Sequence, residues 1–317
     1  MALFDVQTIG LHAGNRVSHS PQDSDSEWSV PDWRAFGIAT HRHFFEVTST
    51  NDVARDLSTA LPDDRFPLLI TCVHQTKGRG RHGRQWSHSS GGLACSIAVR
   101  LGATSDAALF RSAQDQHRLS IWTAVCLHET AQYYLPRHSC RIKWPNDLMI
   151  DDRKNAGILI EPVPGRPLSM VVGIGVNINN VPMAVDGTAS DDRFSWTESA
   201  ESFSVPEVLA EFLRRWLAPQ TEWPPAIETL HAQFAAADWL HGKRLEVLAT
   251  GFWKVLPNGE LQAGSSEPAP GALSSDGSIS HYTGEYVGLD PRGYLKLRTD
   301  AGELWVFPSV ERVRTLP

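Results

Sequence analysis

Two long apolar runs, separated by a short polar link, constrain the fold more than any other feature of this chain. The runs are NAGILIEPV at 155–163 and SMVVGIGVNI at 169–178. Each is typical of a buried strand, and the link between them is too short for the crossover helix that parallel neighbours need. The pair therefore predicts adjacent strands of an antiparallel or mixed sheet. The glycines at 173 and 175 interrupt the second run and indicate a bulge or a close approach at the backbone.

The rest of the chain adds further strands, helices and a second, all-β region. Alternation and apolar runs predict strands at 43–47, 68–73 and 93–101. Helical spacing predicts helices after Ser49-Thr50-Asn51 and over residues 106–132, 205–217 and 226–240. Past Gly242 short alternating runs between Gly, Pro and Asp turns predict about five short strands, and the Gly/Ser/Pro-rich insert at 257–283 predicts a surface loop.

These elements define the fold class and the domain organisation that we expect. The class is α+β, with a central mixed or antiparallel sheet flanked by helices and a small β domain at the C-terminal side. The expected divisions are a poorly patterned N-terminal extension at 1–42, a main domain at 43–241 and a small β-barrel domain at 242–317.

Composition excludes several classes of function. The chain carries 29 basic and 36 acidic side chains, so its formal net charge is −7, whereas nucleic-acid binders usually carry a basic excess. We therefore expect no nucleic-acid partner. No stretch of 18 consecutive apolar residues occurs and the N-terminus lacks the pattern of a secretory signal, so we expect no membrane association. The four cysteines form no CxxC pair, which favours a cytoplasmic protein with no disulfide framework and no metal site.

One basic segment stands out against this acidic background. Residues 78–86 read GRGRHGRQW. Glycines allow the backbone to approach a ligand closely, and arginines between them offer paired donors to phosphate or carboxylate. The spacing fits neither a P-loop nor a dinucleotide-binding fingerprint. A solvated basic loop, or a loop that binds single-stranded RNA through Arg and Trp, remain as alternatives.

Four other segments carry polar groups at positions where a site could form, and each also has a purely structural interpretation. Ser49-Thr50-Asn51 fits an ordinary helix N-cap, and KWPND at 143–147 fits a turn. Lys154 fits an edge-strand lysine that blocks aggregation, and GIGVN at 173–177 fits a bulged strand.

Taken together, the order and spacing of these segments resemble the biotin protein ligases. The family's GRGRxGRxW loop, its upstream STN, its KWPND, its K-x-AG-I-L-x-E strand and its G-x-G-x-N strand all have counterparts here, over about residues 43–178. The resemblance implies a catalytic domain of the biotin/lipoate ligase type, similar to class II aminoacyl-tRNA synthetases, followed by an SH3-like β domain. It also implies formation of biotinyl-5′-AMP from biotin and ATP with Mg²⁺, then transfer of biotin to a lysine of a biotin carboxyl carrier domain of acetyl-CoA carboxylase or a related carboxylase.

The same resemblance assigns roles to particular residues. The biotin-binding residues that it implies are Ser49, Thr50, Asn51, Gln75, Arg79, Gly80, Arg81 and Lys154. The nucleotide-binding residues that it implies are Arg79, Arg81, Trp86, Asn146, Lys154 and Asn177. Lys154 and Arg81 are expected to act in catalysis by neutralising charge, and Asp147 by orienting or deprotonating the acceptor amine.

Departures from the family pattern keep other interpretations open. Residues 1–42 are too short and too unpatterned for the DNA-binding domain that some bacterial members carry, and the ending FPSVERVRTLP lacks the bacterial GE-S-L-R pattern. The alternatives are a lipoate protein ligase, for which an RRxxGGG-type loop would be expected, and a non-catalytic protein that binds biotin.

Overall fold

The protein is described here from a computed structural model. The ranges that the structure describes are 32–100, 113–166, 169–180, 192–199, 201–218, 227–263 and 279–316. The predicted extension at 1–42 therefore lies outside the described residues up to residue 31. Within these ranges no helix is long and apolar enough to cross a membrane.

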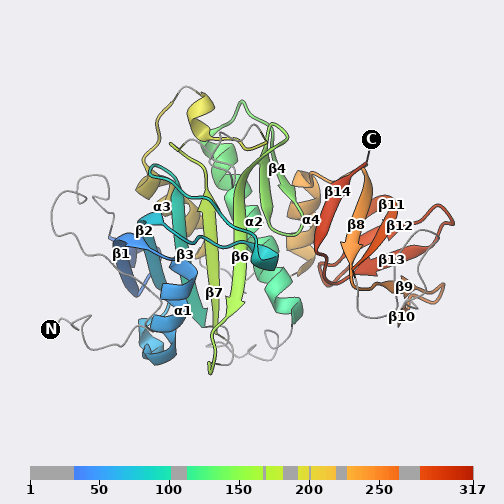
Figure 1. The fold of residues 1–317 in the computed structure, drawn as a ribbon, viewed down its shortest axis with the longest axis horizontal. Helices are drawn as coiled ribbons and strands as arrows, with labels where there is room; N and C mark the ends of the chain where they lie inside the picture. The colour runs from blue at the N-terminus through green and yellow to red at the C-terminus, as the bar shows by residue number, and fades with distance from the viewer. Residues whose placement is uncertain are drawn as a thin grey trace.

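A seven-stranded sheet forms the centre of the larger domain, in the order β1-β2-β3-β7-β6-β5-β4 (Figure 1). Its strands are β1 (Thr40–Val47), β2 (Leu68–Gln75), β3 (Leu93–Arg100), β4 (Cys140–Lys143), β5 (Asp147–Ile150), β6 (Arg153–Pro162) and β7 (Ser169–Val176). Strands β1 and β2 are parallel, and the other neighbours are antiparallel. The sheet is thus mixed, and the two apolar runs pair antiparallel with Ile158 opposite Ile174, which confirms the prediction.

Helices cover both faces of this sheet. Helix α1 (Thr50–Ala60) contacts β2, β3 and β7, whereas α2 (Ala113–Tyr134) contacts β4, β5 and β6. Helix α2 also contacts α3 (Val205–Trp216) and α4 (Ile227–Ala237). Alternate residues of the central strands enter different cores, because successive strand side chains point to opposite faces. In β3, for example, Cys95 and Ile97 join the core under α2, while Ala94 and Ala98 join the core under α1. Burial on both faces explains why these strands read as continuous apolar runs.

The helix expected at 106–132 is observed as α2, whose last residue is Tyr134. Residues 106–112 lie outside the described ranges. The end of the helix fits the local sequence, because Pro136 disfavours the helical conformation of Leu135 and cannot itself continue the helix.

The smaller domain is a seven-stranded antiparallel sheet in the order β10-β9-β13-β12-β11-β8-β14. Its strands are β8 (Arg244–Ala249), β9 (Trp253–Val255), β10 (Leu261–Ala263), β11 (Ser280–Leu289), β12 (Leu295–Arg298), β13 (Leu304–Phe307) and β14 (Arg312–Thr315). The estimate of about five strands was therefore too low, because three- and four-residue strands are too short for alternation to be read from sequence. The predicted surface loop at 257–283 is wrong at both ends, since it contains β10 and the start of β11; residues 264–278 lie outside the described ranges.

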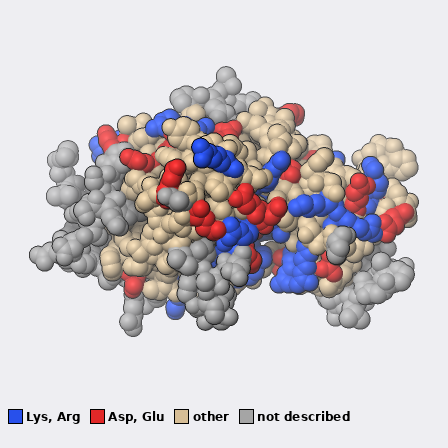
Figure 2. All heavy atoms as spheres, turned by 90° about the horizontal axis from the view of Figure 1, so that it is seen from above, with Lys and Arg blue, Asp and Glu red and all other residues tan. Residues whose placement is uncertain are grey.

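The two domains meet through specific contacts. Trp144 is 1% exposed, and its indole nitrogen donates to the carbonyl of Gly293 at 3.0 Å. The ring of His117 on α2 stacks on Trp144 and meets Tyr294 edge to face. Viewed from above, the molecule shows Lys and Arg side chains interspersed with Asp and Glu over both domains (Figure 2).

Candidate active site

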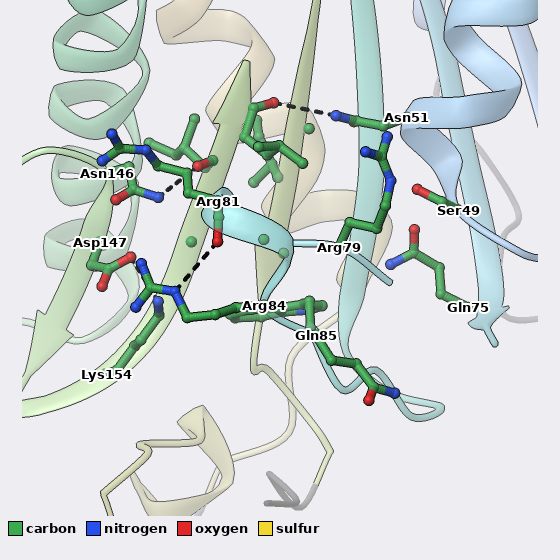
Figure 3. Close-up of a pocket in the computed structure, with 18 of the residues that line it drawn as sticks. Ser49, Asn51, Gln75, Arg79, Arg81, Arg84, Gln85, Asn146, Asp147 and Lys154 are labelled. Carbon is green, nitrogen blue, oxygen red and sulfur yellow. Dashed lines mark hydrogen bonds and ion pairs between the residues drawn. The ribbon is translucent and has the colours of Figure 1, made fainter. Parts of the chain in front are cut away.

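A polar cavity of about 250 Å³ opens on the larger domain, on the side of the sheet that carries α1 and the glycine-rich loop (Figure 3). Residues from α1, β2, the loop at 78–86, the β4–β5 turn, β6, β7 and residues 192–193 converge on it. The lining residues are Ser49, Thr50, Asn51, Gln75, Arg79, Gly80, Arg81, Arg84, Gln85, Trp86, Asn146, Asp147, Lys154, Gly157, Ile158, Leu159, Gly173, Ile174, Gly175, Asp192 and Arg193. Every site residue predicted above lies in this lining except Asn177.

One end of the cavity, which we call the amide end, is lined by Ser49, Thr50, Asn51 and Gln75, with the buried Ser96 behind them. The backbone N–H and the hydroxyl of Thr50 both donate to Oε1 of Gln75, at 2.8 and 3.1 Å. The hydroxyl oxygen of Ser96 lies 2.8 Å from that of Thr50 and 2.6 Å from Oδ1 of Asn51. Sequence reasoning missed Ser96, whose only signal was one serine within an apolar strand.

The start of helix α1 explains why Ser49 belongs to this end. Ser49 is the N-cap residue of α1, but its side chain makes no capping hydrogen bond and is 2% exposed. The side-chain oxygen Oε1 of Gln75 instead accepts from the N–H of Thr50. The plain N-cap interpretation is therefore wrong for the side chain, which lines the cavity.

The glycines of β7 make room for side chains above the sheet. A Cβ on Gly173 would lie 2.1 Å from Oδ1 of Asn51, and one on Gly175 would lie 2.4 Å from the ring of Trp86. The β3–β7 and β6–β7 registers run through both positions without a shift. The alternative of a bulge is therefore wrong, and the alternative of a close approach is confirmed.

Arg79 anchors the base of the glycine-rich loop rather than pointing freely into the cavity. Its guanidinium donates to Oε1 and Oε2 of Glu161 at 2.9 and 2.7 Å and to Oδ1 of Asp52 at 2.7 Å. Burial alone would lower the pKa of Arg79, but the hydrogen bonds and charges of Glu161 and Asp52 outweigh it and raise the pKa. Nδ2 of Asn51 donates to the same Glu161 carboxylate at 2.8 Å, so the loop base and the amide end share one support. The sequence analysis assigned no role to these two carboxylates.

The rest of the loop folds back over the cavity as a hairpin. Gly80 N–H donates to the carbonyl of Arg84 at 2.7 Å, and Trp86 N–H donates to that of Gly78 at 2.9 Å. Arg81 lines the cavity, and its burial lowers the pKa of its guanidinium. His82 reaches the small domain, where its ring lies 2.8 Å from the Glu311 carboxylate.

The opposite side of the cavity contains an ion pair between β5 and β6. Lys154 Nζ donates to Oδ1 of Asp147 at 2.7 Å (Figure 3). Strand β6 lies between β5 and β7 in the sheet, so the interpretation of Lys154 as an edge-strand lysine is wrong. The KWPND segment does form the turn between β4 and β5, and Nδ2 of Asn146 donates to the carbonyl of Ile158 at 2.8 Å.

Two further residues, Asp192 and Arg193, reach the cavity from a segment to which the sequence analysis assigned no element. The carbonyl of Asp192 accepts from Lys154 N–H at 3.1 Å, and the Arg193 guanidinium lies 5.8 Å from the centre of the Trp86 ring. Asn177, by contrast, is 2% exposed at the end of β7, where its Oδ1 accepts from Asn180. The structure therefore does not bring Asn177 into the cavity lining.

Electrostatically, the cavity suits an anion. Its lining contains the cations Arg79, Arg81, Arg84, Lys154 and Arg193, against the carboxylates Asp147 and Asp192. The amide end offers neutral donors and acceptors, so a ligand that spans the cavity needs a neutral polar group at one end and negative charge toward the other.

The chain is similar to known proteins in sequence and in fold. Residues 44–179 match the model of the Biotin/lipoate A/B protein ligase family. This segment of the main domain is thus similar to the biotin/lipoate ligases. The chain is 33% identical over 139 residues to a biotin–[acetyl-CoA-carboxylase] ligase of Paracoccus denitrificans, which covers 43% of this chain and 53% of that protein. It is 28% identical over 229 residues to the Mycobacterium tuberculosis ligase of the same name, which covers 68% of this chain and 75% of that protein.

A solved biotin protein ligase from Aquifex aeolicus shares the fold, with a TM-score of 0.64 and 20% identity over 87% of this chain and 99% of that chain. The chain is thus similar in sequence to biotin protein ligases over part of its length, and it shares their fold. The fold class expected from the sequence is confirmed by these relatives and by the mixed sheet.

Proposed function

We propose that the protein activates biotin as biotinyl-5′-AMP and then transfers biotin to a lysine of a biotin carboxyl carrier domain. The observation that carries the proposal is the layout of the cavity, which joins an amide end to a set of cations beneath one folded loop. A ureido ring suits the neutral donors and acceptors of Thr50 and Gln75, and a carboxylate suits the cations. The Aquifex ligase with this fold was solved in complex with biotin and ATP.

The first step joins the biotin carboxylate to the nucleotide. A carboxylate oxygen attacks the α-phosphorus of ATP, the bond from that phosphorus to the bridging oxygen breaks, and pyrophosphate leaves with the electron pair. Arg81 and Lys154 hold the carboxylate and the phosphate in contact, so the step depends on positioning and on neutralisation of charge. Trp86 covers the product, and the folded loop keeps water away from a mixed anhydride that water would hydrolyse.

The second step transfers the acyl group to the acceptor. The lysine amine attacks the acyl carbon, the acyl–phosphate bond breaks, AMP leaves, and the amine gives up a proton. Asp147 lies beside Lys154 and orients the incoming amine through its carboxylate, which accepts from Lys154 on Oδ1. By the family resemblance the acceptor is the carrier domain of acetyl-CoA carboxylase or a related carboxylase.

Mg²⁺ fits this cavity as an ion that arrives with ATP. The described ranges contain no group of three or more His, Cys, Asp or Glu side chains placed to hold a metal. Protein sites for Mg²⁺ often use one or two carboxylates together with substrate phosphates, and Asp147 and Asp192 line the cavity. When bound, the ion would neutralise phosphate charge.

The cysteines support a reducing location for this activity. All four, at 72, 95, 126 and 140, are free and buried, and burial raises the pKa of the Cys95 thiol to about 12. Unpaired thiols of this kind are typical of a cytoplasmic protein. We therefore propose that the protein acts in the cytoplasm.

A pyrophosphate-release assay tests the proposal against its alternatives. Biotin should support ATP-dependent release, and lipoate or octanoate should not, because an apolar dithiolane would leave Thr50 and Gln75 unpaired. Without a carrier domain, pyrophosphate release should stop after a burst. Adding a carrier domain should make the release continuous. Equal turnover with lipoate would assign a lipoate ligase, and biotin binding without any release would assign a non-catalytic binding protein.

A further inference from the structure

Arg193 is held beside Lys154 by the backbone. Lys154 N–H donates to the carbonyl of Asp192 at 3.1 Å, and Phe194 N–H donates to the carbonyl of Lys154 at 2.9 Å, so that Lys154 and Arg193 form a parallel bridge. Side chains of bridged residues lie on the same face of a sheet. The backbone therefore places the two cations side by side in the cavity, and no contact between their long side chains is needed to do so.

The two cations differ in what neutralises them. Lys154 forms an ion pair with Asp147 at 2.7 Å. Arg193 forms no ion pair with any described residue, and its Nη1 atom is buried without a hydrogen-bond partner among them. A buried guanidinium donor that lacks an acceptor is costly, and a bound anion would remove that cost.

The register of the sheet gives the order of groups along the cavity. Asn51 lies above Gly173, which pairs with Ser96 on one side and Leu159 on the other. Trp86 lies two residues further along β7, above Gly175 and the paired Gly157. Both Lys154 and Arg193 lie within 6 Å of the Trp86 ring. Arg193 thus lies beside Trp86, whose ring is two residues along β7 from the glycine beneath Asn51.

We infer that Arg193 binds the β- and γ-phosphates of ATP, the part of the nucleotide that leaves as pyrophosphate. This inference rests on the proposed function, in which the amide end holds the biotin ring and the carboxylate lies near Arg81. The leaving pyrophosphate takes the electron pair of the broken bond, so negative charge grows on it during adenylation. A planar guanidinium donates two parallel hydrogen bonds to phosphate oxygens, and Arg193 is the lining cation beside Trp86 whose charge no described carboxylate offsets.

Binding and kinetics of Arg193→Ala, Arg193→Gln and Arg193→Lys test the inference. Calorimetry with pyrophosphate alone and with ATP alone should show affinities about 10- to 100-fold weaker in the Ala and Gln variants, with partial recovery in the Lys variant. Biotin affinity should stay within about twofold of wild type, because the amide end is unchanged. At saturating biotin, the KM for ATP should rise in the same order of variants.

Arg153→Ala is the matched control, because Arg153 precedes Lys154 in β6 and its guanidinium pairs with Glu198 at 2.7 Å, outside the cavity lining. It should bind pyrophosphate like wild type. Thermal unfolding of each variant identifies any that fail to fold. The pyrophosphate and ATP affinities of the folded Arg193 variants then test the inference. Unchanged pyrophosphate and ATP affinity in folded Arg193→Ala or Arg193→Gln, or an equal loss in Arg153→Ala, would overturn the inference.

Failure of the proposed function gives a different result. If wild type released no pyrophosphate with biotin but still bound pyrophosphate through Arg193, the phosphate site would stand and the biotin assignment would fall. If biotin-dependent pyrophosphate release did not depend on Arg193, the biotin assignment would stand and the phosphate site at Arg193 would fall.

Discussion

The two ends of the cavity are completed to different degrees. At the amide end, Thr50, Gln75 and Ser96 already bond to one another, and the Asn51 amide is bonded to Glu161. The other end, which we call the cation end, is lined by Arg81, Lys154 and Arg193. There, Nη1 of Arg193 is a buried donor without a partner among the described residues. A neutral polar ring can be recognised by groups that are fixed in advance, because little charge has to be moved out of water. A phosphate site needs net positive charge, so the bound phosphate itself supplies the partner that the cation lacks.

The largest effect that distinguishes the two ends is expected from Lys154→Ala. This substitution removes a cation at the site of adenylation and leaves Asp147 without its ion-pair partner. Adenylation should slow by about 10²- to 10³-fold, the range typical of losing one donor to developing charge. Biotin affinity, measured by calorimetry, should change far less. Near-normal pyrophosphate release would show that Lys154 takes no part in catalysis.

Arg81→Gly should weaken retention of the intermediate more than its formation. It removes a charged contact worth about 1.5–3 kcal/mol in a desolvated site, and the added glycine increases the freedom that the loop loses on closing. Biotinyl-5′-AMP should then escape and label lysines of bystander albumin, detected on a biotin blot. Acetylated albumin, whose lysines are blocked, serves as the control. Labelling equal to that of wild type would mean that the loop does not retain the intermediate.

His117, whose pKa burial and the charge of Arg81 both affect, makes the stability of the folded protein sensitive to acid. Burial, and then the charge of Arg81, lower the pKa of His117 to about 4. An unfolded chain takes up the proton near pH 6.5, so this histidine makes stability fall as the pH drops from about 6.5 toward 4, by about 2 kcal/mol at pH 5.

Chemical denaturation of wild type and His117→Gln between pH 7 and pH 5 measures this contribution. His41 and His88, whose pKa values burial also lowers to about 4, are the same in both proteins, so the difference between the two slopes isolates His117. We expect a flatter pH dependence in His117→Gln. Parallel curves would exclude a buried, neutral His117.

The smallest effect is expected from Glu161→Gln, which acts on the support shared by the amide end and the loop base. The amide still offers an oxygen to Arg79, but the charge between Arg79 and Asn51 is lost. A partly exposed pair of this kind is worth about 1 kcal/mol, so the KM for biotin should rise about fivefold with a smaller change in kcat. Glu198→Gln, on the surface pair with Arg153, is the control. A fall in kcat alone would place Glu161 in the chemistry instead.

Local patterns predicted much of the fold. The two apolar runs predicted adjacent strands of an antiparallel or mixed sheet because their link is too short for a crossover, and those strands are β6 and β7. The small domain has more strands than the five or so expected, because strands as short as β9 and β10 carry no readable period. Alternative interpretations of Ser49, Lys154 and the β7 glycines were equally consistent with the sequence, and only the sheet order and the contacts above it decided between them.

The sequence by itself determined the chemistry available to the site. The arginines and glycines of 78–86, the STN segment and KWPND were recognisable as one constellation because each lies in a short contiguous stretch. Tertiary structure decided which partners those groups have. Glu161 holds Arg79, Ser96 supports Thr50, and Arg193 lies beside Lys154. Each of these contacts joins segments that are far apart in the chain and are brought together by sheet pairing. No local sequence pattern could therefore have predicted them.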